Sequence, residues 1–134
     1  MELTINWLAV AAATIISIAT AYVWYSPKGF NDPWTKITKV TKGGTTPFVL
    51  LFVTNFITAL ALTASISIAA AYFKNDSVWL ALGVGVVLWL SFAAATLLQH
   101  NAFEHKPYKL TLINTGYEFT IFIGMALAIG LIGS

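Results

Sequence analysis

Four long uncharged runs constrain this chain more than any other feature of its sequence. They cover residues 3–27, 47–73, 77–99 and 110–134. Only Glu118 interrupts the last of them. An α-helix needs about 20 apolar residues to cross the roughly 30 Å hydrocarbon core of a bilayer, and each run meets that length. The runs therefore predict four transmembrane helices. Their expected bounds are about residues 5–25, 47–72, 77–98 and 110–132.

We expect an all-α fold in which these helices form one integral-membrane four-helix bundle, a single domain over residues 1–134. Hydrophobic residues make up 58% of the chain and charged residues 9%. The alternative, a soluble all-helical bundle, would need polar helix faces to meet water, and almost none remain. The first run follows Glu2 rather than a basic segment and is longer than a usual signal core. We therefore expect it to be a helix of the mature protein.

The residue types that the chain lacks exclude several kinds of chemistry and partner. It has no cysteine, which excludes disulfides, thiol catalysis and thiolate metal sites. Its positive charge comes from scattered lysines without arginine, so it offers no basic groove to a nucleic acid. We find no cofactor-binding loop and no Ser-His-Asp set. We therefore expect no cofactor and no nucleic-acid partner, and a lipid bilayer around the helices.

A short interfacial helix is predicted between the first two crossings. Asp32 is a good N-cap, Pro33 suits the first helical position, and the glycines at 43 and 44 would end the helix. One face would carry Trp34, Ile37 and Thr41, and the other Lys36, Lys39 and Lys42. Such a segment is typical of a helix that lies on an anionic leaflet. The alternative is an irregular loop with solvated lysines.

Small residues recur along the predicted helices, mostly at every fourth position. Side chains of this size let helix backbones approach closely, and such packing replaces the hydrophobic drive that is absent in lipid. These surfaces favour assembly, as a homo-oligomer or as an accessory subunit of a larger membrane complex. The alternative is that they pack one monomer together. The positions are Ala9, Ala13, Ser17, Ala21, Asn55, Ala59, Thr63, Ser67, Ala71, Ala81, Gly85, Ala93, Gly116, Thr120, Gly124 and Ala128.

A second hypothesis starts from Glu118, the acidic residue inside the last crossing. A carboxylate there is costly unless it has a partner, a proton or a watery cavity. Asn114 lies one helical turn away, and both side chains lie about 120° round the helix from its small residues. With Asn55 and Tyr117 they would line the path of a transporter or channel for protons, cations or a small solute. The alternative is a protonated Glu118 that is hydrogen-bonded to Asn114 or Asn55 and serves only packing.

A third hypothesis, a membrane enzyme, rests on the polar segment at residues 99–109. His100 and Glu104 are one helical turn apart and would face the same metal ion, whereas His105 points elsewhere on a helix. Two ligands do not make a site, so we expect an exposed polar turn, no metal and no catalytic residues. The sequence therefore favours a non-enzymatic membrane protein.

The lysines predict the orientation of the bundle. In a four-crossing protein the first and third loops, residues 26–46 and 99–109, lie on the same side. Together they hold six of the seven lysines. Positively charged loops tend to stay in the cytoplasm. We therefore expect both loops to be cytoplasmic and both termini to lie outside.

A set of aromatic and polar residues near the helix ends resembles the pattern of a known family. The set consists of Asn6, Trp7, Trp24, Tyr25, Ser26, Pro27, Phe103, Glu104 and Pro107. In this pattern, and over nearly its whole length, the chain resembles the small multipass membrane family catalogued as domain of unknown function 1761. The resemblance implies a four-helix protein of the bacterial inner membrane with no established activity. It extends to Asn114 and Tyr117 and does not include Glu118.

Overall fold

The structure, a computed structural model, describes residues 4–39 and 45–134, and within them it contains helices and no strands. The elements are α1 (Trp7–Trp24), α2 (Asn31–Thr38), α3 (Thr45–Phe73), α4 (Val78–Leu88), the π-helical segment η1 (Trp89–Ala94), α5 (Ala95–Phe103) and α6 (Tyr108–Ile132). Because α4, η1 and α5 follow one another without a break, the long helices correspond to the four predicted crossings. The predicted all-α fold is confirmed.

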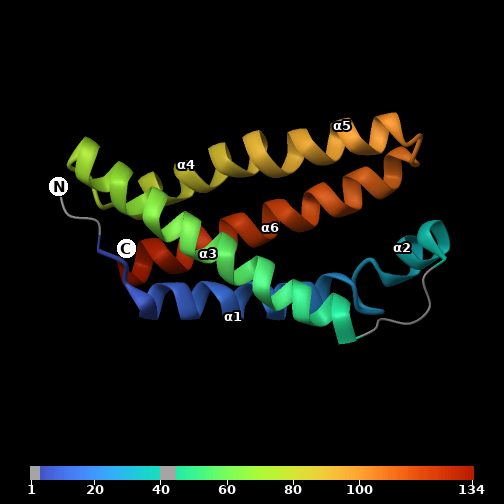
Figure 1. The fold of residues 1–134 in the computed structure, drawn as a ribbon, viewed down its shortest axis with the longest axis horizontal. Coiled ribbons are helices and arrows are strands. Elements are labelled where there is room, and N and C mark those ends of the chain that lie inside the picture. The colour runs from blue at the N-terminus through green and yellow to red at the C-terminus, as the bar shows by residue number, and fades with distance from the viewer. Residues whose placement is uncertain (1–3, 40–44) are drawn as a thin grey trace.

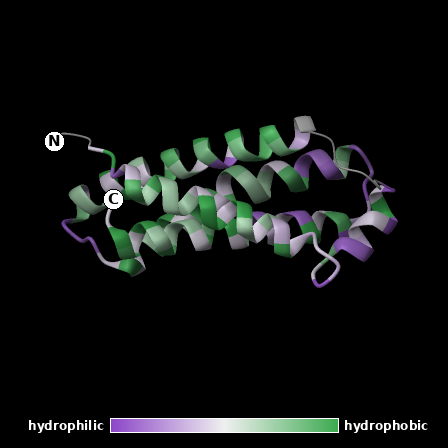
Figure 2. Cartoon of the chain, turned by 90° about the horizontal axis from the view of Figure 1, so that it is seen from below, coloured by the Kyte–Doolittle hydropathy of each residue, from purple (hydrophilic) through white to green (hydrophobic). Residues whose placement is uncertain are grey.

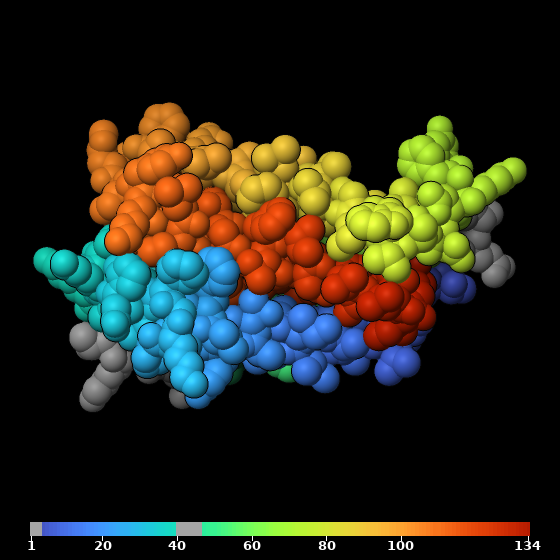
Figure 3. All heavy atoms as spheres, turned by 180° about the vertical axis from the view of Figure 1, so that it is seen from behind, coloured from blue at the N-terminus to red at the C-terminus, as the bar shows by residue number. Residues whose placement is uncertain are grey.

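The last helix, α6, lies at the centre of the bundle (Figure 1). It runs between α1 on one side and the α4–η1–α5 helix on the other, and Figure 3 shows the same order from behind. The third long helix, α3, packs against α1, α4 and α6. The two ends of the chain meet where the Asn6 amide donates to the Ser134 carbonyl at 3.2 Å. The bundle is therefore assembled around α6.

The long helices have the length and composition of membrane spans. In the part of the chain that the structure describes, four segments qualify, Trp7–Trp24, Pro47–Phe73, Val78–Phe103 and Tyr108–Ile132. Hydrophilic residues gather mainly at the two ends of the bundle, and hydrophobic residues cover the length between them (Figure 2). Large apolar side chains face outward on each span, among them Ile15, Phe52, Phe92 and Leu131. An outer surface of this kind belongs in lipid, so the chain is a multipass membrane protein.

Glycine and alanine bring α4 and α6 into close contact. A Cβ atom added at Gly85 would lie 2.9 Å from the Cβ of Ala126, and one added at Gly130 would lie 2.9 Å from the Cβ of Ala81. Both distances are too short for two carbon atoms, so the glycines are what lets the two backbones approach. Hence the small residues of the predicted third crossing are used inside the monomer.

The small residues of α1 have the same role. Ala9, Ala13 and Ser17 have no exposed surface, and they pack towards α3 and α6, the neighbours of α1. On α6 itself, a Cβ added at Gly124 would meet Ile16 at 3.3 Å. This arrangement matches the alternative in which the small residues pack one monomer together.

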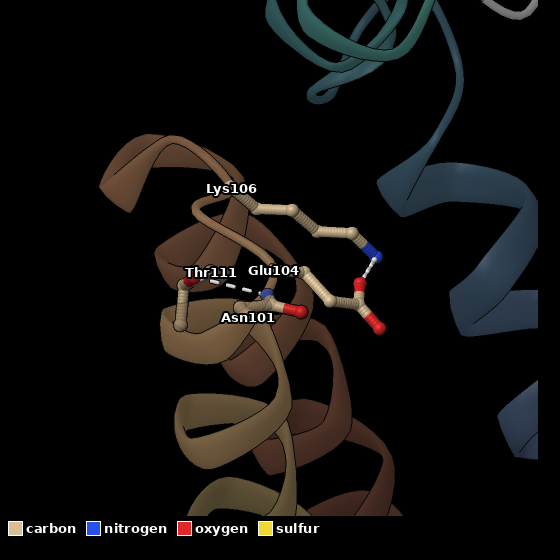
Figure 4. A network of polar contacts seen from close by, with 4 residues as sticks. All are labelled: Asn101, Glu104, Lys106 and Thr111. Carbon is tan, nitrogen blue, oxygen red and sulfur yellow. Dashed lines mark hydrogen bonds and ion pairs between the residues drawn. The ribbon is translucent and has the colours of Figure 1, made fainter.

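The predicted end of the third crossing at residue 98 is wrong. The helix continues to Phe103, because Asn101 is buried and its Nδ2 donates to Thr111 Oγ1 at 2.9 Å across the turn to α6 (Figure 4). The turn is shorter than the predicted loop at residues 99–109, and it includes His105 in a left-handed conformation, with φ of 55°. The other three crossings begin and end within two residues of their predicted bounds.

A short helix does follow the first crossing, but its predicted cap is wrong. α2 begins at Asn31, before Asp32, and Phe30 at the N-cap makes no side-chain hydrogen bond. The helix ends at Thr38, where Lys39 takes a left-handed φ of 60°. It is amphipathic as predicted, with Trp34 half-buried and Lys36 exposed. The predicted stop at the glycines, and the positions 41 and 42, lie outside the described residues.

Candidate functional site

A tight turn after α1 fixes Trp24 and Tyr25, the two aromatic residues that bond to α6. The Phe30 amide donates to the Trp24 carbonyl at 2.6 Å, and the Gly29 amide donates to the Ser26 carbonyl at 2.9 Å. A Cβ atom at Gly29 would overlap the carbonyl oxygens at the end of α1, so the turn requires glycine there. The Trp24 indole, held in this way, lies over Gly116 and donates to the Ile113 carbonyl at 3.2 Å.

Tyr25 is the residue that links α1 to the polar face of α6. Its hydroxyl donates to Asn114 Oδ1 at 2.8 Å. Its ring packs on Tyr117 with centroids 5.0 Å apart, and on Trp34 of α2 with centroids 5.5 Å apart. The hydrogen bond joins residues 89 positions apart. Sequence reasoning placed Tyr25 only in the family pattern, since no local signal connects it with Asn114.

Two buried polar groups face each other between α3 and α6. Asn55 and Tyr117 are 8% and 7% exposed. The Asn55 amide approaches the Tyr117 hydroxyl, but among the described residues neither Asn55 Nδ2 nor Tyr117 Oη has a hydrogen bond of good geometry. A buried polar group without a partner costs about 1–3 kcal/mol. Both groups can therefore donate a hydrogen bond to a water molecule or to another polar guest.

Glu118 lies beside these groups and is half-buried. Its carboxylate is near enough to the hydroxyls of Tyr25 and Tyr117 to act on both electrostatically. Within the described part of the chain it makes no hydrogen bond and no ion pair. Neither hydrogen bond of the packing alternative, from a protonated Glu118 to Asn114 or to Asn55, is formed among the described residues, and the Asn114 oxygen accepts from Tyr25 instead.

The four predicted polar residues thus lie close together at the junction of α3 and α6, and Tyr25 of α1 joins them. We call Tyr25, Asn55, Asn114, Tyr117 and Glu118 the polar centre. It combines one carboxylate, two amides and two phenols inside or at the edge of apolar helices. This set can hold a proton, a water molecule or a small cation through oxygen atoms.

The opposite face of α6 is fully satisfied. Trp89, at the start of η1, donates its indole N–H to the Thr115 carbonyl at 3.0 Å. Its ring packs edge to face on Phe119 with centroids 4.8 Å apart. Thr115 in turn donates its hydroxyl to the Thr111 carbonyl at 2.7 Å. This face therefore holds the α4–η1–α5 helix in place, and within the described part of the chain it has no buried side-chain polar atom without a partner.

The segment that carries His100, Glu104 and His105, on which the enzyme hypothesis rests, contains one ion pair among its described side chains. Glu104 pairs with Lys106 at 2.8 Å in an exposed position (Figure 4). The hydrogen bond from Lys106, and then its charge, lower the pKa of the Glu104 carboxyl. Among the described residues no group of three or more His, Asp or Glu side chains could hold a metal ion. The segment is best described as a polar turn stabilised by one ion pair.

Other residues of the family pattern have structural positions. Asn6 caps α1, because its Oδ1 accepts from the Leu8 amide at 3.1 Å, and its Nδ2 donates to the Gly133 carbonyl at 2.7 Å. Pro107 stands at the N-cap position of α6. The rings of Trp7 and Phe103 are 60% and 80% exposed, at opposite ends of the bundle. Aromatic residues at both ends suit the two membrane interfaces.

Comparison with known proteins identifies a family that covers most of the chain. The family described as "Protein of unknown function (DUF1761)" matches residues 8–130. No curated protein and no solved structure matches the chain.

Proposed function

The chain belongs to the DUF1761 family, whose function is unknown, and we propose that it is a membrane protein that moves a proton or a small cation through the polar centre around Glu118. The proposal rests on the arrangement of side chains, since the family supplies no activity. The sequence favours assembly and gives transport as the alternative, and the proposal takes that alternative.

Glu118 is the observation that carries this proposal. It lies in a candidate membrane span and is half-buried, without a hydrogen bond or an ion pair among the described residues. A carboxylate in such surroundings is costly, and acidic residues within membrane spans commonly mark proton and ion pathways. A proton, or a cation held also by the nearby amide and phenol oxygens, would provide the missing compensation. The unsatisfied atoms of Asn55 and Tyr117 extend this polar path.

Flux into proteoliposomes tests the proposal. The purified protein would be reconstituted with a pH-sensitive dye inside, and a potassium diffusion potential would drive protons or added cations across. We expect flux in the wild type and its loss in Glu118→Gln, which keeps the size of the side chain. Glu104→Gln, which removes an exposed carboxylate at the rim, is the matched control and should transport like the wild type. Equal flux in Glu118→Gln and the wild type would remove Glu118 from the mechanism.

Assembly is the second candidate function, as a homo-oligomer or as an accessory subunit of a larger complex. It is favoured by the outward faces of α3 and α5. Phe48 and Phe52 on α3 are 66% and 56% exposed, and Phe103 on α5 is 80% exposed. α3 packs against α4 but is separated from α5 by α6 (Figure 1). Blue-native electrophoresis in mild detergent tests this candidate, and a strictly monomeric band would contradict it.

We propose that the protein is not an enzyme and that it lies in the inner membrane with the α1–α3 and α5–α6 connections in the cytoplasm. The ion pair of Glu104 with Lys106 supports the absence of an enzymatic activity. The lysines near the two connections support their cytoplasmic position. Elemental analysis of the purified protein tests the first part. Stoichiometric zinc or iron would overturn it and revive a metal-dependent reaction at His100.

A further inference from the structure

A pocket separates the end of α1 from the beginning of α3. It has a volume of about 480 Å³, within the roughly 300–1,000 Å³ of typical small-molecule sites. α1 contributes Ile18 and Tyr22, α3 contributes Phe48 and Leu51, and Tyr117 of α6 lines it as well. Most of these side chains are aliphatic or aromatic, so the pocket suits a hydrocarbon.

The position of the pocket determines what reaches it. Phe48 and Tyr22 are 66% and 80% exposed, and they lie on helices that span the membrane, so the pocket adjoins the surrounding lipid. Its lining also includes Tyr25, Ser26 and Pro27, which follow the end of the first span. Aromatic and turn residues at this position belong at the headgroup level of a bilayer. A guest would thus enter with its apolar part along the helices and its polar part near Ser26.

Three lysines lie in the stretch of chain that follows the polar end of this pocket. Lys28 directly follows Pro27. α2, which carries Lys36 and is followed directly by Lys39, contacts the pocket residue Tyr25 through Trp34. All three lysines are exposed, and none forms an ion pair among the described residues. One acidic residue, Asp32, lies in the same stretch, so the segment from Lys28 to Lys39 carries three positive charges and one negative charge. This surplus favours an anionic headgroup.

We propose that this pocket binds an anionic phospholipid, with one acyl chain between α1 and α3 and the phosphate near Lys28, Lys36 and Lys39. The site adjoins the polar centre and shares Tyr25 and Tyr117 with it, so an acyl chain in the pocket packs against two side chains of the polar centre. The lipid proposal does not depend on the proposed transport.

Native mass spectrometry of the full chain in detergent tests this site. The probes are phosphatidylglycerol and phosphatidylcholine with identical acyl chains, titrated separately. We expect phosphatidylglycerol to bind at least tenfold more tightly. Ile18→Trp fills the pocket and should weaken that binding at least tenfold. Ile15→Trp on the same helix lies outside the pocket and is 67% exposed, so it should change binding less than twofold.

The headgroup is tested separately by exposed lysines, whose replacement leaves the fold intact. Lys28→Gln should weaken binding of phosphatidylglycerol about fivefold, the effect of one lysine near a membrane surface. Lys74→Gln, at the opposite end of the bundle, should leave binding unchanged. Equal affinity for the two lipids, or unchanged binding in Ile18→Trp, would overturn the proposal. Displacement of the lipid by glycerol 3-phosphate would also overturn it, since the site would then recognise a free phosphate rather than an acyl chain.

Discussion

A methyl group added at Gly85 tests the close contact between α4 and α6. The new Cβ would lie 2.9 Å from the Cβ of Ala126 and 3.2 Å from the Phe122 carbonyl oxygen. Ordinary carbon contacts begin at about 3.5 Å, so the helices must separate by roughly 0.6 Å or bend. Such overpacking costs about 1–3 kcal/mol. The better helix propensity of alanine returns at most about 1 kcal/mol, so Gly85→Ala should destabilise the bundle by about 1 kcal/mol.

Unfolding in mixed micelles of mild detergent and dodecyl sulfate, followed by circular dichroism, measures this effect. Gly83→Ala is the matched control, because it lies on the same helix and a Cβ there meets nothing within 4 Å. It should be neutral or slightly stabilising. In the double variant Gly85→Ala with Ala126→Gly the methyl group only changes helices. We therefore expect the double variant to be more stable than the sum of the two single effects by roughly 1–2 kcal/mol. If Gly85→Ala proved as stable as Gly83→Ala, or if the two substitutions were additive, the deduced contact between α4 and α6 would be wrong.

Three further predictions concern the turns and the polar centre. Because Lys106 lowers the pKa of Glu104, their ion pair stabilises the fold above the ordinary pKa of glutamate, and this contribution is lost as the pH falls through the lowered value. Glu104→Gln should thus lower the unfolding temperature slightly at neutral pH, less in high salt, and not at all in strongly acidic buffer. Tyr25→Phe removes the bond to Asn114 and should cost about 1 kcal/mol in the same micelle titration, with Tyr22→Phe, an exposed tyrosine, as the neutral control. Gly29→Ala should cost about 1–3 kcal/mol, because its Cβ would overlap backbone oxygens, and a stable Gly29→Ala would contradict the tight turn after α1.

The sequence predicts the number of crossings well because length and hydropathy alone decide them in lipid. It also predicts that Asn114 and Glu118 lie on one face of a helix, since that follows from 100° per residue. The end of the third crossing was missed because the polar run at Gln99 and Asn101 is typical of a loop. Its backbone stays helical because Asn101 donates a hydrogen bond to Thr111 on the next helix.

The polar centre could be predicted only in part. The sequence shows Glu118 and Asn55 inside apolar spans, where burying a polar side chain costs free energy, and this predicts that both need a partner. Their partners are not visible, because the bond from Tyr25 to Asn114 depends on how α1 packs against α6. In the same way, small residues predict that helices approach closely but not which helices do so. The structure shows that many of these contacts lie within the monomer, as at Gly85 and Ala126.

Labelling of single cysteines tests the four-crossing arrangement most directly. The chain has no cysteine of its own, so each variant reports one position. Asp32→Cys, Asp76→Cys and Glu104→Cys replace exposed acids in the three connections and keep every lysine. With a membrane-impermeant maleimide, we expect Asp32→Cys and Glu104→Cys to react only in inverted vesicles and Asp76→Cys only in right-side-out vesicles. Reaction of all three from the same side would contradict a bundle whose four long helices cross the membrane.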